Sequence, residues 1–119
     1  MPNRLLSLLS STSHCLLVLL LLIPSIVSVA QPTAPNQIRT WGLTLSWTLV
    51  TWADNAGDEA EYRVERSTNN GAWVEIAVLP ADSVSYDDKS VNSVNSYRYQ
   101  VRAYRSTDSS YSGYTAVAA

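Results

Sequence analysis

Apolar and polar side chains alternate with a period of two along most of the chain beyond residue 36. The clearest case is residues 97–103, which place Tyr97, Tyr99, Val101 and Ala103 on one face and polar side chains on the other. The same alternation, or the β-branched and aromatic bias of strands, marks residues 48–52, 62–66 and 73–78. No helical stripe of ten residues interrupts this region. The pattern therefore predicts strands with one buried and one solvated face.

Turn signals separate these strands at intervals of roughly 8–12 residues. They lie at residues 54–57, 69–71, 80–82 and 107–110. The strongest is the dipeptide Asn70-Gly71, because both residues tolerate the positive φ of a type I′ turn. It predicts a hairpin between the strand that ends near Arg66 and the strand that contains Trp73. Short strands at this spacing predict an all-β sandwich or barrel.

Residues 1–30 have the layout of a secretory signal peptide. Arg4 supplies a short positive region, residues 15–23 form an unbroken apolar run, and Pro24 ends it. Small side chains at Ser28 and Ala30 stand before a cleavage point at Gln31. The alternative is a retained membrane anchor, but a spanning helix needs ~20 apolar residues. Residues 15–30 supply only sixteen positions, with a proline and two serines among them.

Three segments follow from this interpretation. Residues 1–30 are the signal peptide, residues 31–36 are a short Pro-containing lead, and residues 37–119 form one folded domain. We expect the lead to be extended and unpacked. The mature chain is expected to be secreted or extracellular, with the periplasm and the cell envelope as alternative destinations, and not to associate with a membrane after cleavage.

Cleavage would also remove most of the reactive side chains. The whole chain has 8 Lys and Arg against 10 Asp and Glu, a net charge of -2, with one Cys and one His. Arg4, His14 and Cys15 all lie in the predicted signal peptide, so the mature chain has a net charge of -3 and neither thiol nor imidazole. Disulfides, Cys or His catalysis and Cys- or His-ligated zinc are thereby excluded, and we expect no cofactor. The acidic balance offers no electrostatic footprint for nucleic acid.

Five features, in order along the chain, resemble a fibronectin type III domain of the kind common in exported bacterial proteins. Trp52 precedes Tyr62 by ten residues, as a strand-B tryptophan precedes the strand-C aromatic residue. The other four features are a hairpin at 69–77, a strand at 85–88, a tyrosine corner over 91–97 and a final strand over 110–117. The resemblance covers nearly all of residues 34–119.

The resemblance implies a seven-stranded, immunoglobulin-like β-sandwich of two sheets. It implies that the Tyr97 hydroxyl bonds to upstream backbone. It also places two sets of side chains in the core. The first is Ile38, Leu43, Val50 and Trp52, and the second is Tyr62, Val64, Tyr99 and Val101. Domains of this family are mostly spacers, adhesion modules and accessory units, so the resemblance implies no reaction.

The acidic residues do not form a recognisable catalytic or metal motif. Asp54, Asp58, Glu59 and Glu61 cluster in one loop, but their spacing does not match a calcium-binding loop. A pair of carboxylates is the equipment of a glycosidase, although a small sandwich loop seldom forms the required cleft. We interpret this loop as a solvated turn, and Asp87 with Asp88 likewise. Lys89 beside Ser90 does not indicate a Ser–Lys pair, because neighbours at a strand end point to opposite faces.

The tryptophans suggest a binding surface. With Trp52 in the core, Trp41, Leu45, Trp47 and Leu49 fall at positions that would face outward, and Trp47 cannot share the inner face because it lies five residues away. Such an apolar patch marks a partner or ligand site, and Trp41, Trp47 and Leu49 are the candidates. In the alternative register, residues 43–47 form the core strand, Trp47 is buried, and the patch does not exist.

The sequence thus predicts a non-catalytic extracellular protein-interaction or spacer module, whose partner is an unidentified extracellular protein or polysaccharide. Three alternatives remain open. One is a carbohydrate-binding accessory module that uses exposed Trp and Tyr side chains. The others are a small hydrolase using the loop acids and the N-terminal fragment of a larger secreted multidomain protein.

Overall fold

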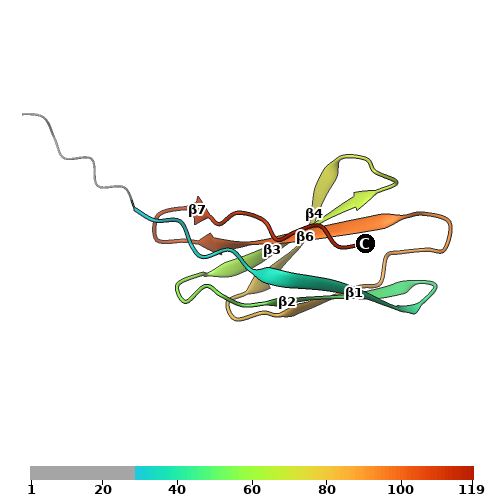
Figure 1. The fold of residues 1–119 in the computed structure, drawn as a ribbon, viewed down its shortest axis with the longest axis horizontal. Coiled ribbons are helices and arrows are strands. Elements are labelled where there is room, and N and C mark those ends of the chain that lie inside the picture. The colour runs from blue at the N-terminus through green and yellow to red at the C-terminus, as the bar shows by residue number, and fades with distance from the viewer. Residues whose placement is uncertain (1–28) are drawn as a thin grey trace, which may run out of the picture.

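The computed structural model describes residues 29–119, so the predicted signal peptide, and the anchor that is its alternative, lie almost wholly outside the described residues. In the described range no helix has the length and hydropathy needed to cross a bilayer. The range instead contains seven strands (Figure 1). They are β1 (Asn36–Thr44), β2 (Trp47–Ala53), β3 (Glu61–Thr68), β4 (Trp73–Pro80), β5 (Ser85–Asp88), β6 (Tyr97–Arg105) and β7 (Ser110–Tyr111).

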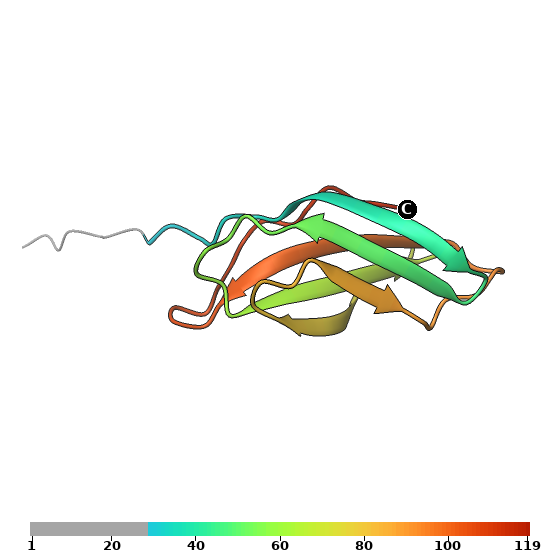
Figure 2. The same ribbon diagram turned by 90° about the horizontal axis from the view of Figure 1, so that it is seen from below.

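The strands form two antiparallel sheets packed face to face (Figures 1 and 2). One sheet has the order β1-β2-β5 and the other has the order β4-β3-β6-β7. The core between them consists of Val50 and Trp52 from the first sheet and Tyr62, Val64, Tyr99, Val101 and Ala103 from the second. The Trp52 and Tyr62 rings meet at 5.8 Å between centroids. The all-β sandwich with seven strands is therefore the architecture that the sequence predicts.

The alternation of β6 shows why these residues form a half-buried strand. Tyr99, Val101 and Ala103 are buried, while Arg98 and Arg102 on the opposite face remain partly exposed. A strand with this pattern can bury its apolar side chains only by pairing within a sheet that covers a core. β6 pairs with β3 along the full length of that strand.

The β3–β4 hairpin forms where the sequence predicts it, but its turn lies one residue earlier. The residues with positive φ are Asn69 (52°) and Asn70 (57°), and Gly71 has no positive φ. The Gly71 N–H donates to the Thr68 carbonyl at 2.9 Å, which closes the turn around the two asparagines. Asparagine adopts the left-handed region readily, so Asn69-Asn70 forms the turn predicted for Asn70-Gly71.

The tyrosine corner predicted at Tyr97 is present. The backbone N–H of Asn92 donates to the Tyr97 hydroxyl oxygen at 3.1 Å. The Asn92 side chain in turn accepts from the N–H groups of Val94 and Asn95, both at 3.1 Å. These bonds fix the chain between β5 and β6 although a serine, Ser93, stands where the family often has proline.

The final strand expected over residues 110–117 is only partly formed. β7 ends at Tyr111, and the chain then follows the edge of β6: the Ser112 and Thr115 N–H groups donate to the Ala103 and Val101 carbonyls, while side-chain hydroxyls replace carbonyls as acceptors. The Ser112 hydroxyl accepts from the Ala103 N–H at 2.8 Å, and the Thr115 hydroxyl accepts from the Val101 N–H at 3.1 Å. The pairing on the edge of β6 is preserved, but the backbone departs from a regular ladder.

The Pro-containing lead, expected to be unpacked, lies against the sandwich. Pro32 and Pro35 are buried, and the Ala34 carbonyl accepts from the Asn55 side chain at 3.2 Å. Proline rings bury apolar surface at little entropic cost, which makes a proline lead well suited to cover the end of a small core. The lead enters at the end opposite to the β1–β2 hairpin (Figure 2).

Candidate interaction surface

The outer face of the three-stranded sheet carries the candidate binding residues. The pairing of β1, β2 and β5 arranges it in rows: Arg39, Thr51 and Ser85 form one row, and Trp41, Leu49 and Asp87 form the next. Trp47 lies two residues before Leu49 in β2, and because side chains alternate along a strand, it is on the same side. We call the set Arg39, Trp41, Trp47, Leu49, Thr51, Ser85, Asp87 and Lys89 the tryptophan face.

The observed register has Trp52 inside and Trp47 outside. Trp52 is 5% exposed and packs in the core, whereas Trp47 is half-buried on the opposite side of β2. The Trp47 indole N–H donates to the Asp87 carboxylate at 3.0 Å, and the Lys89 ammonium lies 5.2 Å from the Trp47 ring centroid. The indole is therefore held in place by a hydrogen bond and a cation–π contact.

Trp41 is the most open aromatic side chain of this face. It is 51% exposed, and among residues 29–119 no Lys, Arg or second aromatic ring packs on it. Its pairing partner across the strands is Leu49, which is half-buried. At the tip of the hairpin Leu45 is 78% exposed, so the apolar surface continues from Trp41 to the end of the sandwich.

Leu43 is not a core residue, which corrects the placement implied by the family resemblance. It is 47% exposed. The β1–β2 pairing shifts between Gly42 and Thr44, so the regular alternation of β1 is broken there. A bulge of this kind re-aims side chains at the end of a hairpin, and here it adds Leu43 to the exposed apolar surface.

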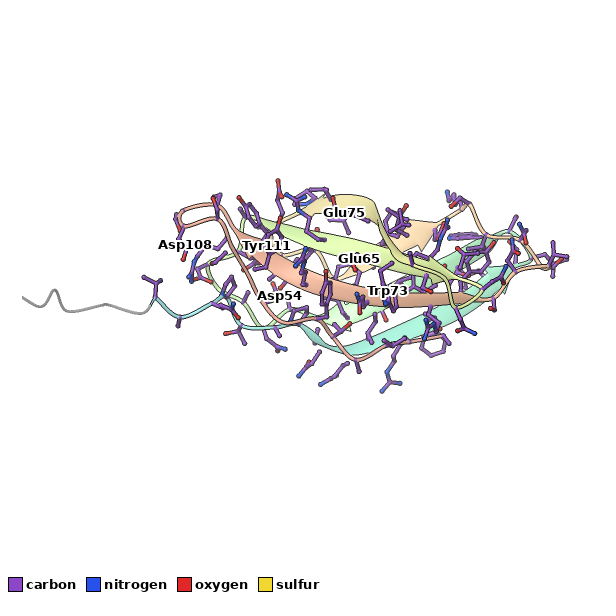
Figure 3. The ribbon with its side chains drawn as sticks, turned by 90° about the horizontal axis from the view of Figure 1, so that it is seen from above. Asp54, Glu65, Trp73, Glu75, Asp108 and Tyr111 are labelled. Carbon is purple, nitrogen blue, oxygen red and sulfur yellow. The ribbon has the colours of Figure 1, made fainter. Side chains whose placement is uncertain are left out.

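On the four-stranded sheet, arginine side chains cover the outward aromatic rings. Figure 3 shows Trp73, Glu65, Glu75 and Tyr111 on the four-stranded sheet. There a guanidinium covers each outward ring: Arg98 lies over Trp73 (5.4 Å), Arg63 over Tyr104 (5.1 Å), and Arg102 over both Tyr111 (3.8 Å) and Tyr114 (4.7 Å). These stacks occupy the faces of the rings, so this sheet offers a ligand less free aromatic surface than Trp41 does.

Asp88 is not in a solvated turn, contrary to the interpretation of its sequence. It is fully buried between the sheets. Its carboxylate accepts from Arg66 at 2.7 Å, from the Tyr99 hydroxyl at 2.9 Å and from the Ser90 hydroxyl at 2.7 Å and backbone N–H at 3.0 Å. Burial alone would raise the pKa of Asp88, but these hydrogen bonds hold it below its ordinary value. Asp88 thus joins β5 to β3 and β6, and the Ser90 hydroxyl is engaged in the same network.

The acids of residues 54–61 are also more structured than a solvated turn. Asp54 accepts hydrogen bonds from the Tyr62 hydroxyl and the Ala56 N–H, and burial together with that contact raises the pKa of Tyr62. Glu59 is buried and accepts from the Asp82 N–H at 3.0 Å. Asp58 pairs with Arg105, and Glu61 pairs with Arg63.

Three of these acids come close enough to share a cation. Carboxylate oxygens of Asp54, Glu59 and Asp82 all lie within 4.8 Å of one another. Asp54 and Glu59 are already hydrogen-bonded to protein donors, however, and these bonds account for their position at the base of the loop. We therefore assign no metal to this cluster. Asp82, the third member, lies in a turn that is distant in the chain, so the spacing of the acids in residues 54–61 does not indicate it.

The space between the sheets opens at one place along the β1 side. Thr40, Gly42, Thr48, Tyr97, Tyr99 and Ala119 line a pocket there. The Thr40 hydroxyl donates to the Ala119 carbonyl at 2.7 Å across it. The pocket contains no arrangement of nucleophile, base and oxyanion donors that would support a reaction.

Comparisons with known proteins identify the fold and no more. No protein-family model matches the chain, and no curated protein matches it. An Fn3-like protein from Clostridium thermocellum is similar in structure, with a TM-score of 0.62 and 24% identity over 75% of this chain and 91% of that one. The sixth fibronectin type III domain of human fibronectin type III domain containing protein 3 has a TM-score of 0.61 and 20% identity, over 79% and 87%.

A third similar structure is the pectate lyase Pel3 from Pectobacterium carotovorum, with a TM-score of 0.60 and 21% identity. The match covers 71% of this chain but 25% of the lyase. Together with the seven strands in two antiparallel sheets, these neighbours define the fold as a fibronectin type III-like β-sandwich of the immunoglobulin-like class.

Proposed function

We propose that the mature chain is a non-catalytic exported module that binds a partner through the tryptophan face. The observation that carries this proposal is the exposure of Trp41 and Leu45 on a sheet whose core is formed by other residues, Val50 and Trp52. Large apolar side chains that contribute nothing to a core and lie together on one surface typically mark a binding site. The chain from Thr40 to Ala53 contains no charged residue, so the exposed side chains of this hairpin are apolar or uncharged polar ones.

A spacer would not need this surface, and the comparison of the two sheets supports a binding role over a spacer role. Both sheets have outward aromatic residues, but only the four-stranded sheet stacks a guanidinium on each of them. Trp41 keeps its ring accessible instead. An exposed ring that is both apolar and flat is the kind of side chain that dominates the binding energy of interfaces.

A carbohydrate-binding accessory role is the second candidate, and Trp41 is the observation that favours it, because a flat exposed indole stacks on the apolar face of a sugar ring. The similar structure in a pectate lyase supports it by analogy, since a unit of this fold there accompanies an enzyme named for a polysaccharide substrate. In either case the chain binds and does not catalyse.

Site-specific photo-cross-linking tests the binding surface. A photoreactive amino acid replaces Leu45, at the hairpin tip next to the tryptophan face, or, as the control, Val74, which is 58% exposed on β4 of the other sheet. We expect material from the native secreted fraction to be captured at position 45 and not at position 74, and Trp41→Ala to abolish that capture. Equal capture at the two positions, or none at either, would contradict the proposal.

A further inference from the structure

The charges of the tryptophan face indicate what kind of partner it fits. Three of the seven Lys and Arg side chains in residues 29–119, Arg63, Arg66 and Arg105, form salt bridges with carboxylates. Arg39 forms neither a salt bridge nor a side-chain hydrogen bond within that range, and it is exposed. It lies two residues from Trp41 on the same side of β1, so its guanidinium and the open indole share one surface.

The second cation of this face lies at its other end. Lys89 forms no salt bridge within the described residues and rests over the Trp47 ring. Arg39 is paired with Thr51, and Trp47 lies four residues from Thr51 along β2. The rows of Arg39 and Trp47 are therefore about 13 Å apart at the usual rise per residue. Two cations thus bracket an apolar strip of Trp41, Leu49 and Trp47. The exposed Asp87 carboxylate lies between them and accepts a hydrogen bond from the Trp47 indole N–H, so two cations and one carboxylate leave this face with a net positive charge.

Hydroxyl groups complete the arrangement. Thr51 and Ser85 lie in the same row as Arg39, directly across β2 and β5. The surface therefore combines a flat aromatic ring, hydroxyl groups and an unpaired guanidinium within neighbouring rows. A chain of sugar rings that bear carboxylates matches all three: one ring stacks on Trp41, its carboxylate or that of the next ring pairs with Arg39, and hydroxyls along the chain bond to Thr51 and Ser85.

We infer that the tryptophan face binds an acidic, uronate-type polysaccharide, with Trp41 as the stacking platform and Arg39 as the carboxylate anchor. The inference rests on the proposed function, whose partner it names. Arg98 and Arg102 of the four-stranded sheet also form no salt bridge within the described residues, but each lies over an aromatic ring, whereas Arg39 has no such contact.

The test uses polygalacturonate as the probe and its fully methyl-esterified form as the matched neutral polymer. Binding to the full mature chain is measured by affinity electrophoresis at low salt. We expect polygalacturonate to bind and the esterified polymer to bind more weakly. Trp41→Ala should weaken binding at least about tenfold, as for an interface hot spot. Arg39→Gln should weaken it about two- to fivefold, the range of an exposed ion pair, and the effect should vanish at high salt.

Controls on the other sheet isolate the site. Trp73→Ala and Arg63→Gln remove the same residue types from the four-stranded sheet and should leave binding unchanged. Urea unfolding should show that Trp41→Ala and Arg39→Gln remain folded, because both side chains are largely exposed. Polyglutamate, an anionic polymer without sugar rings, separates an acidic peptide from an acidic sugar.

Each outcome decides between the inference and its alternatives. Equal binding of the esterified polymer with no effect of Arg39→Gln would overturn the acidic class. Polyglutamate binding as tightly as polygalacturonate would overturn the sugar class. If no polysaccharide binds but photo-cross-linking at position 45 captures a protein that Trp41→Ala releases, the inference fails and the proposed function stands. If neither occurs, both fail.

Discussion

Removing the charge of Asp88 should destabilise the protein more than any conservative change on its surface. Asp88→Asn keeps the volume of the side chain, so it creates no cavity, but it removes the negative charge that faces Arg66. The Arg66 side chain is 19% exposed, so its guanidinium would remain largely buried without a counter-ion. Breaking a buried pair by removing one partner typically costs about 3–5 kcal/mol.

The hydrogen bonds of Asp88 support the same magnitude. Its carboxylate accepts from Arg66, from Tyr99 and twice from Ser90, all between 2.7 and 3.0 Å. An asparagine offers one acceptor oxygen and a donor NH₂ group, so at least one of these donors would face another donor. Since small domains have total stabilities of about 5–15 kcal/mol, Asp88→Asn should leave the fold marginal.

Urea unfolding followed by tryptophan fluorescence measures this loss. The matched control is Asp87→Asn, one residue earlier, where an exposed carboxylate accepts a single bond from Trp47. We expect the control to lose about 1 kcal/mol or less. A loss below 1 kcal/mol for Asp88→Asn, or equal losses for the two variants, would refute the assignment of Asp88 as the buried link between the sheets.

The pH dependence gives an independent check. Because the pKa of folded Asp88 is lowered, its contribution to the free energy of unfolding is present above the unfolded-state pKa of about 4. That contribution is lost as the pH falls through the lower folded-state pKa. The difference in stability between the native chain and Asp88→Asn should therefore shrink progressively below about pH 4. A difference that stays constant from pH 7 to pH 2 would be inconsistent with an ionised Asp88 in the core.

Two further predictions concern backbone groups held by side-chain oxygens. Tyr97→Phe removes the acceptor of the Asn92 N–H and should lower the free energy of unfolding in urea by about 1 kcal/mol. The control Tyr104→Phe, whose hydroxyl forms no hydrogen bond within the described residues, should cost less. Equal losses for the two variants would show that the tyrosine corner does not contribute to stability. Thr115→Val preserves the shape of a buried side chain but removes the oxygen that accepts from the Val101 N–H, so a loss of about 1–3 kcal/mol is expected, with faster amide exchange at Val101; unchanged exchange there would contradict the role of the hydroxyl.

The side chains that the sequence placed correctly are those decided by alternation alone. In β6 each residue faces the side that its parity predicts, and the ten-residue spacing from Trp52 to Tyr62 matches the observed contact of their rings. Period two is a direct consequence of strand geometry, so it survives whenever a strand is regular.

Arg66 and Asp88 could have been found by the same rule. Arg66 continues the parity of Tyr62 and Val64, which places it on the inner face of β3 and requires a buried partner. Asp88 shares the parity of Tyr86 in β5 in the same way. Because charged side chains are usually exposed, the charge of both residues predicts exposure, which is the opposite of what their parity predicts. What parity cannot give is the pairing itself, because β3 and β5 belong to different sheets.

Local irregularities account for the placements that the sequence missed. Leu43 lies at a shift in β1–β2 pairing, and the β3–β4 turn is formed by Asn69-Asn70 rather than Asn70-Gly71. After Tyr111, hydroxyls replace carbonyls as acceptors for N–H groups of β6. Each of these features depends on where the neighbouring strand ends, and the sequence of one segment alone does not determine that position. The same holds for Asp82, which joins Asp54 and Glu59 only after the fold is complete.

The separation of stability from binding follows from the alternation of β2. Val50 and Trp52 point inward and stabilise the core, while Trp47 and Leu49, at positions of the opposite parity, point outward. Because adjacent residues serve different faces, a change at Trp41 or Leu45 removes surface that folding does not use. A fold under selection for stability alone would be expected to replace such side chains with polar ones, since exposed indoles promote aggregation. The partner proposed above would cover these side chains and pair with Arg39, which forms no salt bridge within the described residues.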